Sequence, residues 1–269
     1  MTIRVCLAGA TGWAGSALAR ATAATDDIEL VAAVSRKGAG RNLGDLLGEP
    51  RLACPVYATA DEALKQSCDV FFEFTKPEQA KAHVLSALGC RANVVIGTSG
   101  LTDADYAEIA AAADRRQCGV LAVGNFALSV VLLQKFAELA ARYIPQWEIV
   151  DYASDEKRDA PSGTALELAH RLSHVRKSEL TLPLDQTQGI VATRGARINE
   201  SQVHSIRLPS YNISLEITFG LPDERLTLRH DSGPSAVPYV AGALLAIRGV
   251  GTFVGLRRGL DSVLDVALA

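Results

Sequence analysis

Three equally spaced glycines are the first feature of the chain that indicates chemistry. Gly9, Gly12 and Gly15 follow a short apolar run, Ile3–Ala8, and open an Ala-rich segment that favours a helix. A glycine turn between a strand and a helix lets the backbone approach a pyrophosphate, which the helix N-terminus then binds. The spacing differs from that of the usual G-x-G-x-x-G fingerprint, so a plain turn is the alternative. We interpret the segment as a dinucleotide-binding turn because a strand and a helix flank it.

The residues after the second apolar run bear on which dinucleotide binds. Leu30–Val34 is followed by Ser35, Arg36 and Lys37, with no acidic residue among them. An NAD-binding fold commonly has an acid there to hold the ribose hydroxyls, whereas Arg and Lys suit the 2′-phosphate of NADPH. The alternative is a solvated charged loop. The sequence therefore favours NADPH over NADH.

Three further segments follow predicted parallel strands, and we expect them at the same edge of one sheet. They are Phe74–Thr75, Gly97–Gly100 and Asn125–Phe126. Ligands of open α/β sheets bind at the carboxyl ends of the strands, so the three segments together can line a nicotinamide pocket. Each of them alone is typical of an ordinary loop.

A polar segment later in the chain, Asp159–Thr164, has the pattern of a helix start that binds an anion. Pro161–Ser162 stand where the helix begins, and Gly163 and Thr164 offer backbone N–H groups to a substrate carboxylate. Lys157 lies just upstream. The alternative is a capped helix beside a surface lysine.

Other polar side chains have weaker interpretations. His170 and His174 lie four residues apart on one helix face, but no glutamate follows His170 and no third ligand is evident, so we expect no metal site. Arg207 and Arg229 can either attract an acidic substrate or form salt bridges. The five cysteines include no Cys-x-x-Cys pair, and we interpret them as small buried side chains in a reducing compartment.

The elements that must position these residues change character about halfway along the chain. In the first half, apolar runs alternate with helix-prone segments; the predicted strands are Ile3–Ala8, Leu30–Val34, Asp69–Phe74, Asn93–Ile96 and Val120–Val123. Such alternation predicts an α/β fold with a Rossmann-type, doubly wound parallel sheet and helices on both faces.

After Asn125 the pattern is different. A long helix, Ala127–Tyr143, precedes strands with little helix among the last three; these strands are Trp147–Tyr152, Val203–Leu208, Asn212–Phe219 and Arg225–His230. Strands joined by short turns predict a second, α+β domain with a mixed or antiparallel sheet. We expect a dinucleotide-binding domain at 1–125 and 233–269, and a substrate-binding domain at 126–232.

The composition excludes several other classes. The chain has 269 residues, 48% hydrophobic and 21% charged, as in a globular protein and unlike a disordered or collagen-like one. Lys and Arg number 27 against 30 acidic residues, so no basic excess indicates nucleic acid or an anionic membrane as partner. No apolar stretch approaches about 18 residues and the first residues have no signal-peptide pattern, so we expect a cytoplasmic protein without a membrane span.

Over residues 1–269 the chain resembles the dihydrodipicolinate reductase family, also called 4-hydroxy-tetrahydrodipicolinate reductase. The segments that carry the resemblance are Val5–Gly12, Phe74–Glu78, Val95–Gly100, Asn125–Phe126 and Lys157–Ala165, the last of which is highly specific. The resemblance implies reduction of a cyclic dicarboxylate imine by NADPH or NADH in the diaminopimelate route to lysine. It also implies a homotetramer assembled through the sheets of the second domain.

The same resemblance implies roles for individual positions. Lys157 matches the proton donor of the family, and Gly163 and Thr164 match its substrate-carboxylate binders, with Ser154 and Ser162 beside them. The positions expected to bind the cofactor are Gly9, Ala10, Thr11, Gly12, Trp13, Ala14, Ser35, Arg36, Lys37, Phe74, Thr75, Gly97, Thr98, Ser99, Val123, Gly124, Asn125 and Phe126.

The chain departs from the family pattern at two places. Family members carry a histidine pair in the pattern His-His-x-x-Lys, but the corresponding positions before Lys157 hold Ala153 and Ser154. After Arg207, where the family tends to show Gly-Glu-His, this chain has Ile213–Leu215. The second cation that would help to hold a dianionic substrate is therefore missing.

The missing histidines leave more than one interpretation of the activity. Either Lys157 does the acid work with help from Tyr152, Asp155 or Glu156, or the substrate is a different one. Loss of a positioned acid–base group costs about 10²- to 10⁴-fold in rate, which favours a divergent family reductase or dehydrogenase acting on another imine, amino acid or keto acid. The intact Lys157–Thr164 segment favours the family's own reaction. A nucleotide-binding regulator without turnover is the third hypothesis.

Overall fold

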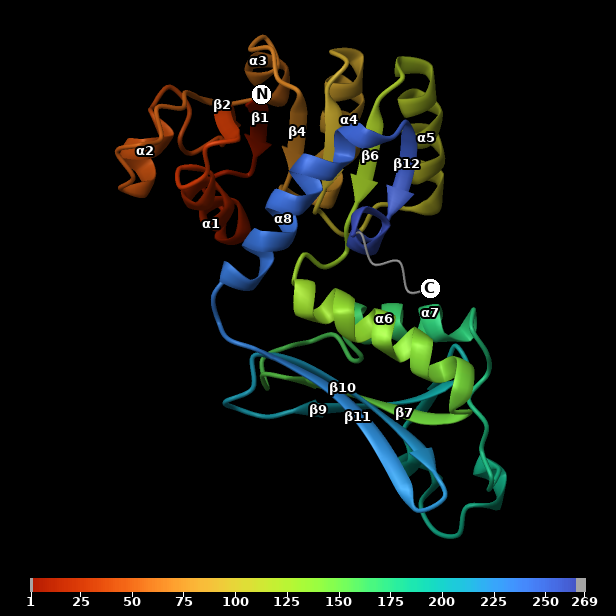
Figure 1. Ribbon diagram of the computed structural model, residues 1–269. Coiled ribbons are helices and arrows are strands. Elements are labelled where there is room, and N and C mark those ends of the chain that lie inside the picture. Colours follow the sequence, from red (N-terminus) through yellow and green to blue (C-terminus); the bar gives the residue numbers. More distant parts are fainter. Residues whose placement is uncertain (1, 265–269) are drawn as a thin grey trace. The chain divides into compact units, whose positions relative to one another are not determined.

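The computed structural model describes residues 2–264 and divides into two compact units (Figure 1). Unit 1 contains the residues up to Leu128 and those from Ala236 onward, and unit 2 contains Ser129–Ser235. The boundaries expected from the sequence fall after residues 125 and 232, three residues earlier in each case. The part of the expected first domain beyond residue 264 lies outside the described residues.

Unit 1 is built on a seven-stranded parallel sheet with the strand order β12-β6-β5-β4-β1-β2-β3. Its strands are β1 (Ile3–Ala8), β2 (Ile28–Val34), β3 (Val56–Tyr57), β4 (Val70–Glu73), β5 (Asn93–Ile96), β6 (Gly119–Ala122) and β12 (Gly255–Arg258). The direction of winding reverses between β1 and β4, which makes this the switch point where ligands bind in such folds. The predicted Rossmann-type, doubly wound sheet is confirmed.

Helices cover both faces of this sheet. They are α1 (Trp13–Thr22), α2 (Leu43–Leu47), α3 (Ala60–Ala63), α4 (Pro77–Gly89), α5 (Asp103–Arg116) and α8 (Val237–Gly249), and the short 3₁₀ helices η3 (Val250–Thr252) and η4 (Leu260–Val263) follow α8. On one face α1 packs against α8, which crosses the sheet in Figure 1. On the other face α3, α4 and α5 enclose a core that includes Val84 and Ile109.

Local signals explain where these elements begin and end. The central strands β1, β4, β5 and β6 are mainly runs of buried apolar residues, as expected for parallel strands covered on both faces. Thr102 starts α5 with a capping box: its hydroxyl accepts a hydrogen bond from the Asp105 N–H, and the Asp105 carboxylate accepts one from the Thr102 N–H. Glu73, the charged residue of β4, is fully buried and does not fit the apolar pattern.

Unit 2 contains a five-stranded mixed sheet in the order β11-β10-β7-β9-β8. Its strands are β7 (Gln146–Ala153), β8 (Ala196–Ile198), β9 (Ser201–Arg207), β10 (Ile213–Leu221) and β11 (Glu224–Ser232), and its 3₁₀ helices are η1 (Leu184–Gln186) and η2 (Val191–Arg194). β7 and β9 are parallel and the other pairs are antiparallel. The predicted second α+β domain with a mixed sheet is confirmed.

Two helices cover one face of the second sheet. α6 (Leu128–Tyr143) and α7 (Gly163–Ser173) pack on a core that includes Trp147, Ile149 and Phe219. Burial alternates along β7, so Val150 and Tyr152 project from the opposite face. We refer to this opposite side as the open face of the sheet.

The cysteines are all free thiols, but they are not all buried. Cys6, Cys54 and Cys118 are buried, Cys68 is partly buried and Cys90 is exposed. Burial raises the pKa of the Cys54 thiol to about 12 and that of the Cys68 thiol to about 11. The prediction of a buried side chain is wrong for Cys90, because this residue follows the last turn of α4, where the chain leaves the helix.

Candidate active site

The glycine turn connects β1 to α1 and leaves the N-terminus of the helix open. Gly9 has a φ of +82°, and a Cβ atom on it would lie 2.2 Å from the carbonyl oxygen of Phe74. A Cβ atom on Gly15 would lie 2.2 Å from the carbonyl oxygen of Gly9. Gly12 caps α1 without a side-chain hydrogen bond to its N–H groups. The turn therefore fits a pyrophosphate, which the N–H groups of the first helical turn can bind.

Two cations lie beside this turn at the end of β2. The hydroxyl groups of Thr11 and Ser35 are 2.7 Å apart, so a hydrogen bond ties the glycine turn to the end of the strand. Arg36 and Lys37 follow directly and are exposed. Their positive charge is thus available to an anion that binds next to the glycine turn.

The carboxyl ends of β4, β5 and β6 carry an aromatic cluster and two threonines. The rings of Phe74 and Phe126 are 5.3 Å apart, and a Cβ atom on Gly97 would lie 2.1 Å from the Phe74 ring. Glycine at position 97 is therefore required by the packing of these rings. Thr75 and Thr98 both donate hydrogen bonds to Glu73. The structure brings these sequence-predicted residues together at one edge of the sheet.

The remaining predicted cofactor positions follow β6. The Val123 N–H donates to the carbonyl oxygen of Ile96, 2.9 Å away, which continues the pairing of β5 and β6. The side-chain oxygen of Asn125 accepts a hydrogen bond from the Ala127 N–H, 2.9 Å away. This bond fixes the turn from β6 into α6, so the segment that includes Gly124 has one defined path along the edge.

Sequence analysis missed two polar residues under this edge, Glu73 and His83. The Nδ1 atom of His83 lies 2.8 Å from Oε2 of Glu73. The signal that could have revealed Glu73 is an acidic residue at the end of an otherwise apolar strand, since buried charges need partners. No local pattern indicates His83, because its partner lies on another element.

Lys157 lies in the loop between β7 and α7. Its Nζ atom is 2.7 Å from Oδ1 of Asp159, and its side chain is 27% exposed. The hydrogen bond from Lys157 lowers the pKa of Asp159. The backbone N–H of Lys157 donates to the carbonyl oxygen of Ser154, 3.1 Å away. The lysine is thus held by its own loop and paired with a carboxylate.

A buried ion pair anchors this loop. Asp151 is fully buried, and its Oδ2 atom lies 2.7 Å from Nη2 of Arg207 and 2.8 Å from the N–H of Ser162, which donates to it. Nη2 of Arg207 also donates to the carbonyl oxygen of Asp159, 2.8 Å away. Asp151 and Arg207 therefore fix both ends of the segment between Lys157 and α7. Sequence analysis missed Asp151, whose partner lies 56 residues away.

The segment ends at the N-terminus of α7. Ser162 is the N-cap, and its hydroxyl accepts a hydrogen bond from the Ala165 N–H at 3.3 Å. Gly163 is exposed and Thr164 is half-buried in the first turn, where the helix dipole is positive. The prediction that a helix begins here is confirmed, with Gly163 as its first residue.

The positions of the missing histidines lie at the end of β7. Ala153 is fully buried, and Ser154 is half-buried. The carboxylate that pairs with Lys157 is that of Asp159 and not that of Asp155 or Glu156, both of which are exposed. We expected Asp155 or Glu156 to help Lys157, but neither pairs with it. The turn of the loop instead brings the carboxylate of Asp159 to the lysine.

Tyr152 lies on the open face of the sheet, away from the side chains of its neighbours in β7. Its ring is 5.1 Å from that of Tyr211, and the guanidinium of Arg229 lies 4.8 Å from its centroid. Burial and then the nearby Glu216 carboxylate raise the pKa of Tyr152, which makes it a weaker acid. Arg229 itself pairs with Asp231 at 2.9 Å and with Glu216 at 3.0 Å. The sequence left open whether Arg207 and Arg229 attract a substrate or form salt bridges. In the structure both form salt bridges.

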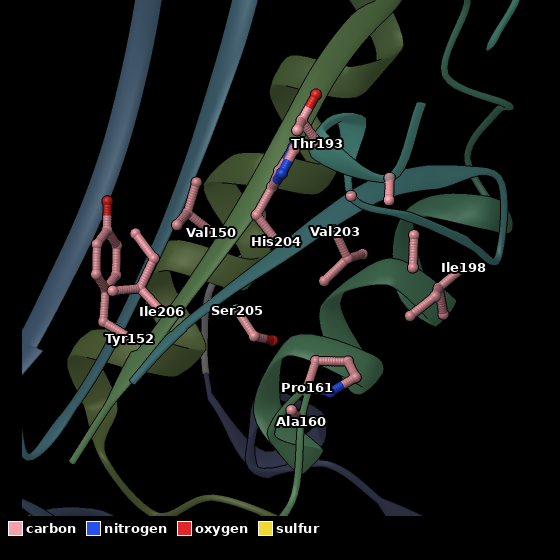
Figure 2. A pocket seen from close by; sticks show the side chains of 13 residues that line it. Val150, Tyr152, Ala160, Pro161, Thr193, Ile198, Val203, His204, Ser205 and Ile206 are labelled. Atoms are coloured by element: carbon pink, nitrogen blue, oxygen red, sulfur yellow. The ribbon is translucent and has the colours of Figure 1, made fainter. Parts of the chain in front are cut away.

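Unit 2 contains a cavity of about 700 Å³, and Figure 2 shows side chains that line it. Val150, His204 and Ile206 from the sheet and Pro161 from the loop before α7 contribute to its lining. Nε2 of His204 lies 2.8 Å from Oε2 of Glu148. Ser154, Ser162, Gly163 and Thr164 do not line this cavity, whereas Ala160 and Pro161 of the predicted anion-binding segment do.

Two further observations concern metals and membranes. Within residues 2–264, no group of three or more His, Cys, Asp or Glu side chains is arranged to hold a metal ion. The rings of His170 and His174 are 4.5 Å apart, at an exposed site on α7. In the same part of the chain, no helix is both long enough and apolar enough to cross a membrane.

Fold and site together define a class. A doubly wound parallel sheet with an open glycine turn at its switch point gives unit 1 the Rossmann-type architecture of dinucleotide-binding proteins. Residues 3–126 match the family described as "Dihydrodipicolinate reductase, N-terminus", and residues 129–264 match "Dihydrodipicolinate reductase, C-terminus". The chain belongs to the dihydrodipicolinate reductase family.

Individual relatives are similar over the full length. The 4-hydroxy-tetrahydrodipicolinate reductase of Bacillus pumilus (strain SAFR-032) is 35% identical over 265 residues, covering 98% of each chain. That of Geobacillus thermodenitrificans (strain NG80-2) is 35% identical over 266 residues, covering 98% of this chain and 100% of the relative. The solved structure described as "Dipicolinate bound Dihydrodipicolinate reductase from Paenisporosarcina sp. TG-14" has a TM-score of 0.85 and 32% identity, covering 98% of this chain and 100% of the other.

Proposed function

We propose that the protein is a 4-hydroxy-tetrahydrodipicolinate reductase, which reduces a cyclic dicarboxylate imine with NAD(P)H in the diaminopimelate route to lysine. The observation that carries the proposal is the loop from Lys157 to Thr164. Asp151 and Arg207 hold it at the start of α7. Full-length similarity to reductases of this name supports the same activity.

The cofactor would occupy the carboxyl edge of the unit 1 sheet. The turn from Gly9 to Ala14 would hold the pyrophosphate, and Ser35, Arg36 and Lys37 would hold the adenosine ribose and its 2′-phosphate. The nicotinamide half would contact Phe74, Thr75, Gly97, Thr98, Ser99, Val123, Gly124, Asn125 and Phe126. Bound NAD(P)H supplies the hydride for the reduction. Arg36 and Lys37 are exposed, and Ser35–Lys37 contains no acidic residue, which favours NADPH over NADH.

The substrate groups would be bound by unit 2. The ammonium group of Lys157 donates a proton to the atom that gains electron density when the imine is reduced. The carboxylate of Asp159, 2.7 Å from Nζ, holds the lysine side chain in place. The positive end of α7 at Gly163 and Thr164 binds a substrate carboxylate, and Ser154 and Ser162 lie beside it.

One observation favours a second candidate function. Ala153 and Ser154 occupy the positions of the family's histidine pair, so a cation that would hold a substrate carboxylate is missing. A divergent reductase or dehydrogenase for another imine, amino acid or keto acid with a single carboxylate needs no second cation. This second candidate shares the cofactor site and Lys157 with the first.

A substrate panel separates the two candidates. The purified protein is given NADPH or NADH with freshly generated 4-hydroxy-tetrahydrodipicolinate, and then with other cyclic imines and with 2-keto acids plus ammonia. Fastest oxidation of NADPH with the first substrate, inhibited by dipicolinate, is the expected result. Faster turnover of another compound supports the second candidate, and no oxidation with any of them excludes both.

We also infer a cytoplasmic homotetramer. The open face of the unit 2 sheet carries an apolar patch formed by Val150, Tyr152 and the 37% exposed Ile206, which a second copy of the chain would cover. The free thiols suit a reducing compartment. Light scattering is expected to give four times the chain mass of 28.5 kDa, and Ile206→Asp is expected to give a smaller species. A monomeric wild-type protein would exclude the assembly.

A further inference from the structure

Glu73 is a buried carboxylate that joins three elements of unit 1. Its Oε1 atom accepts hydrogen bonds from the Thr75 N–H at 2.7 Å, from the Thr75 hydroxyl and from the Thr98 hydroxyl at 3.2 Å. Its Oε2 atom lies 2.8 Å from Nδ1 of His83 on α4. The side chain has no exposed surface, so these donors replace the water that the carboxylate has lost.

The direction of each hydrogen bond follows from the chemistry of the acceptor. A carboxylate has lone pairs and no hydrogen to give, so Nδ1 of His83 must carry a hydrogen and both threonine hydroxyls must direct theirs to Glu73. The Thr98 hydroxyl also lies 3.5 Å from the backbone carbonyl oxygen of Glu73, which is an acceptor as well. Each hydroxyl has a single hydrogen, so toward any further group Thr75 and Thr98 can only accept.

The place of these hydroxyls in the sheet determines what they face. The glycine turn and the cations after β2 lie on one side of the switch point, and β4 and β5 lie on the other. A dinucleotide that has its adenosine half on the first side has its nicotinamide half over the ends of β4 and β5. This step rests on the proposed function, because it requires a nicotinamide nucleotide at this edge.

We infer that Glu73 is a positioning residue that selects the carboxamide of the nicotinamide ring. Because the Thr75 and Thr98 hydroxyls donate their hydrogens to Glu73, they present only acceptor oxygens to a ligand at this edge. The carboxamide NH₂ group is the only hydrogen-bond donor on the nicotinamide ring, so these hydroxyls recognise that group. Glu73 itself does not contact the cofactor; it acts through the two threonines.

Cofactor analogues that differ in this one group test the inference. The 3-acetylpyridine analogue of NADP⁺ has a methyl group in place of NH₂, whereas the thionicotinamide analogue keeps NH₂. Calorimetric titration of the full-length protein is expected to give a dissociation constant about tenfold higher for the acetylpyridine analogue than for NADP⁺. The thionicotinamide analogue is expected to bind within about threefold of NADP⁺.

Substitutions of Thr75, Thr98 and Glu73 test whether these residues cause the difference in affinity between NADP⁺ and the acetylpyridine analogue. Thr75→Val and Thr98→Val remove the two acceptors, and their double variant is expected to bind NADP⁺ and the acetylpyridine analogue equally. Glu73→Ala frees the Thr75 hydroxyl to donate to the acetyl oxygen, so the ratio is expected to fall, and Glu73→Asp is expected to restore part of it. Glu29→Gln, an exposed carboxylate of β2, is the control with an unchanged ratio.

Each outcome separates the inference from the proposed function. Thermal melting identifies any variant that does not fold. If Glu73→Ala does not fold, the threonine variants still test whether the two hydroxyls discriminate between the analogues. A wild-type protein that binds both analogues equally, or an unchanged ratio in the double threonine variant, would overturn the inference and leave the proposed function intact. Failure of the wild-type protein to bind NADP⁺ at all would overturn the proposed function.

Discussion

At the scale of single residues, Lys157 and Asp159 form the pair on which the proposed proton transfer depends. The Nζ and Oδ1 atoms are 2.7 Å apart, and both side chains belong to one short loop. The pair is partly solvated, so its contribution to stability is small. We expect its role to be chemical, because it holds Nζ of the proposed proton donor in the loop before α7.

The pKa of Asp159 provides a direct check of this pair. The hydrogen bond from Lys157 is the largest cause that lowers this pKa from its ordinary value of 3.8, and the charge of Arg207 adds to the effect. A carboxylate with a lowered pKa stabilises the fold above pH 3.8, and this stabilisation is lost as the pH falls through the lower, folded-state value. In Lys157→Ala the pKa measured by carbon NMR titration is expected to rise toward 3.8. An unchanged pKa would show that the pair does not form in solution.

Removal of the lysine also tests the mechanism. Lys157→Ala is expected to lower kcat by about 10²- to 10⁴-fold, because a positioned proton donor is lost. The dissociation constant for NADPH, measured by fluorescence titration, is expected to stay the same, since the cofactor residues lie in unit 1. Arg158→Ala, the exposed neighbouring cation, is the matched control with near-normal kcat. Equal loss in both variants would argue for a general effect on the loop.

The proposed preference for NADPH over NADH rests on Arg36. A charge-assisted hydrogen bond to the 2′-phosphate is worth about 1.5–3 kcal/mol, so Arg36→Ala is expected to weaken NADPH binding by roughly 10- to 100-fold. NADH lacks this phosphate, and its binding is expected to change little. Arg116→Ala, an exposed arginine in the last turn of α5, serves as control. Equal weakening of the two cofactors would exclude phosphate recognition by Arg36.

At the scale of elements, the β1–α1 connection depends on glycine at two positions. Gly9→Ala is expected to lower the free energy of unfolding by at least about 2 kcal/mol, because its φ is +82° and its Cβ would lie 2.2 Å from a carbonyl oxygen. Loss of NADPH binding is expected as well. Gly89→Ala, at the end of α4 with nothing within 4 Å of its Cβ, is expected to be neutral or slightly stabilising. Urea unfolding of the two variants gives the comparison.

Elements with strong local signals could be predicted from the sequence. The glycine turn, the capping residue Thr102 and the apolar run Asn93–Ile96 each contain the information for their own structure, and β5 has the predicted bounds. The sequence indicated a helix-prone segment after the three glycines, but α1 begins at Trp13, before Gly15, because its N–H groups follow the turn at Gly12 directly. Such local patterns predict that a helix or strand exists better than they predict the residues at which it begins and ends.

Elements and pairs that depend on distant partners could not be predicted. Strand β12, Gly255–Arg258, contains two arginines and forms because its backbone pairs with β6. The partners Glu73 and His83 come from different elements, as do Asp151 and Arg207. For the proposed site, the sequence indicated candidate ligand-binding residues, and it missed Glu73, His83 and Asp151, which hold neighbouring segments in position.

At the scale of the whole molecule, each unit has its own core. One includes Val84 and Ile109 and the other includes Trp147 and Phe219, and each consists of residues of one unit. Separate cores allow the units to open independently, with their own free energies of local unfolding. The proposed cofactor residues all lie in unit 1, and the proposed substrate residues all lie in unit 2.

Ligands should therefore stabilise different parts of the chain. NADP⁺ at 100 times its dissociation constant stabilises the state that binds it by about 2.7 kcal/mol. Amide hydrogen exchange is then expected to slow at Gly9–Gly15 and Gly97–Ser99, with little change at the core of α6. Dipicolinate alone is expected to slow exchange at the first turn of α7. If NADP⁺ instead protected α6 and α7 as strongly as the glycine turn, the two units would unfold as one, and the separate-core account would be wrong.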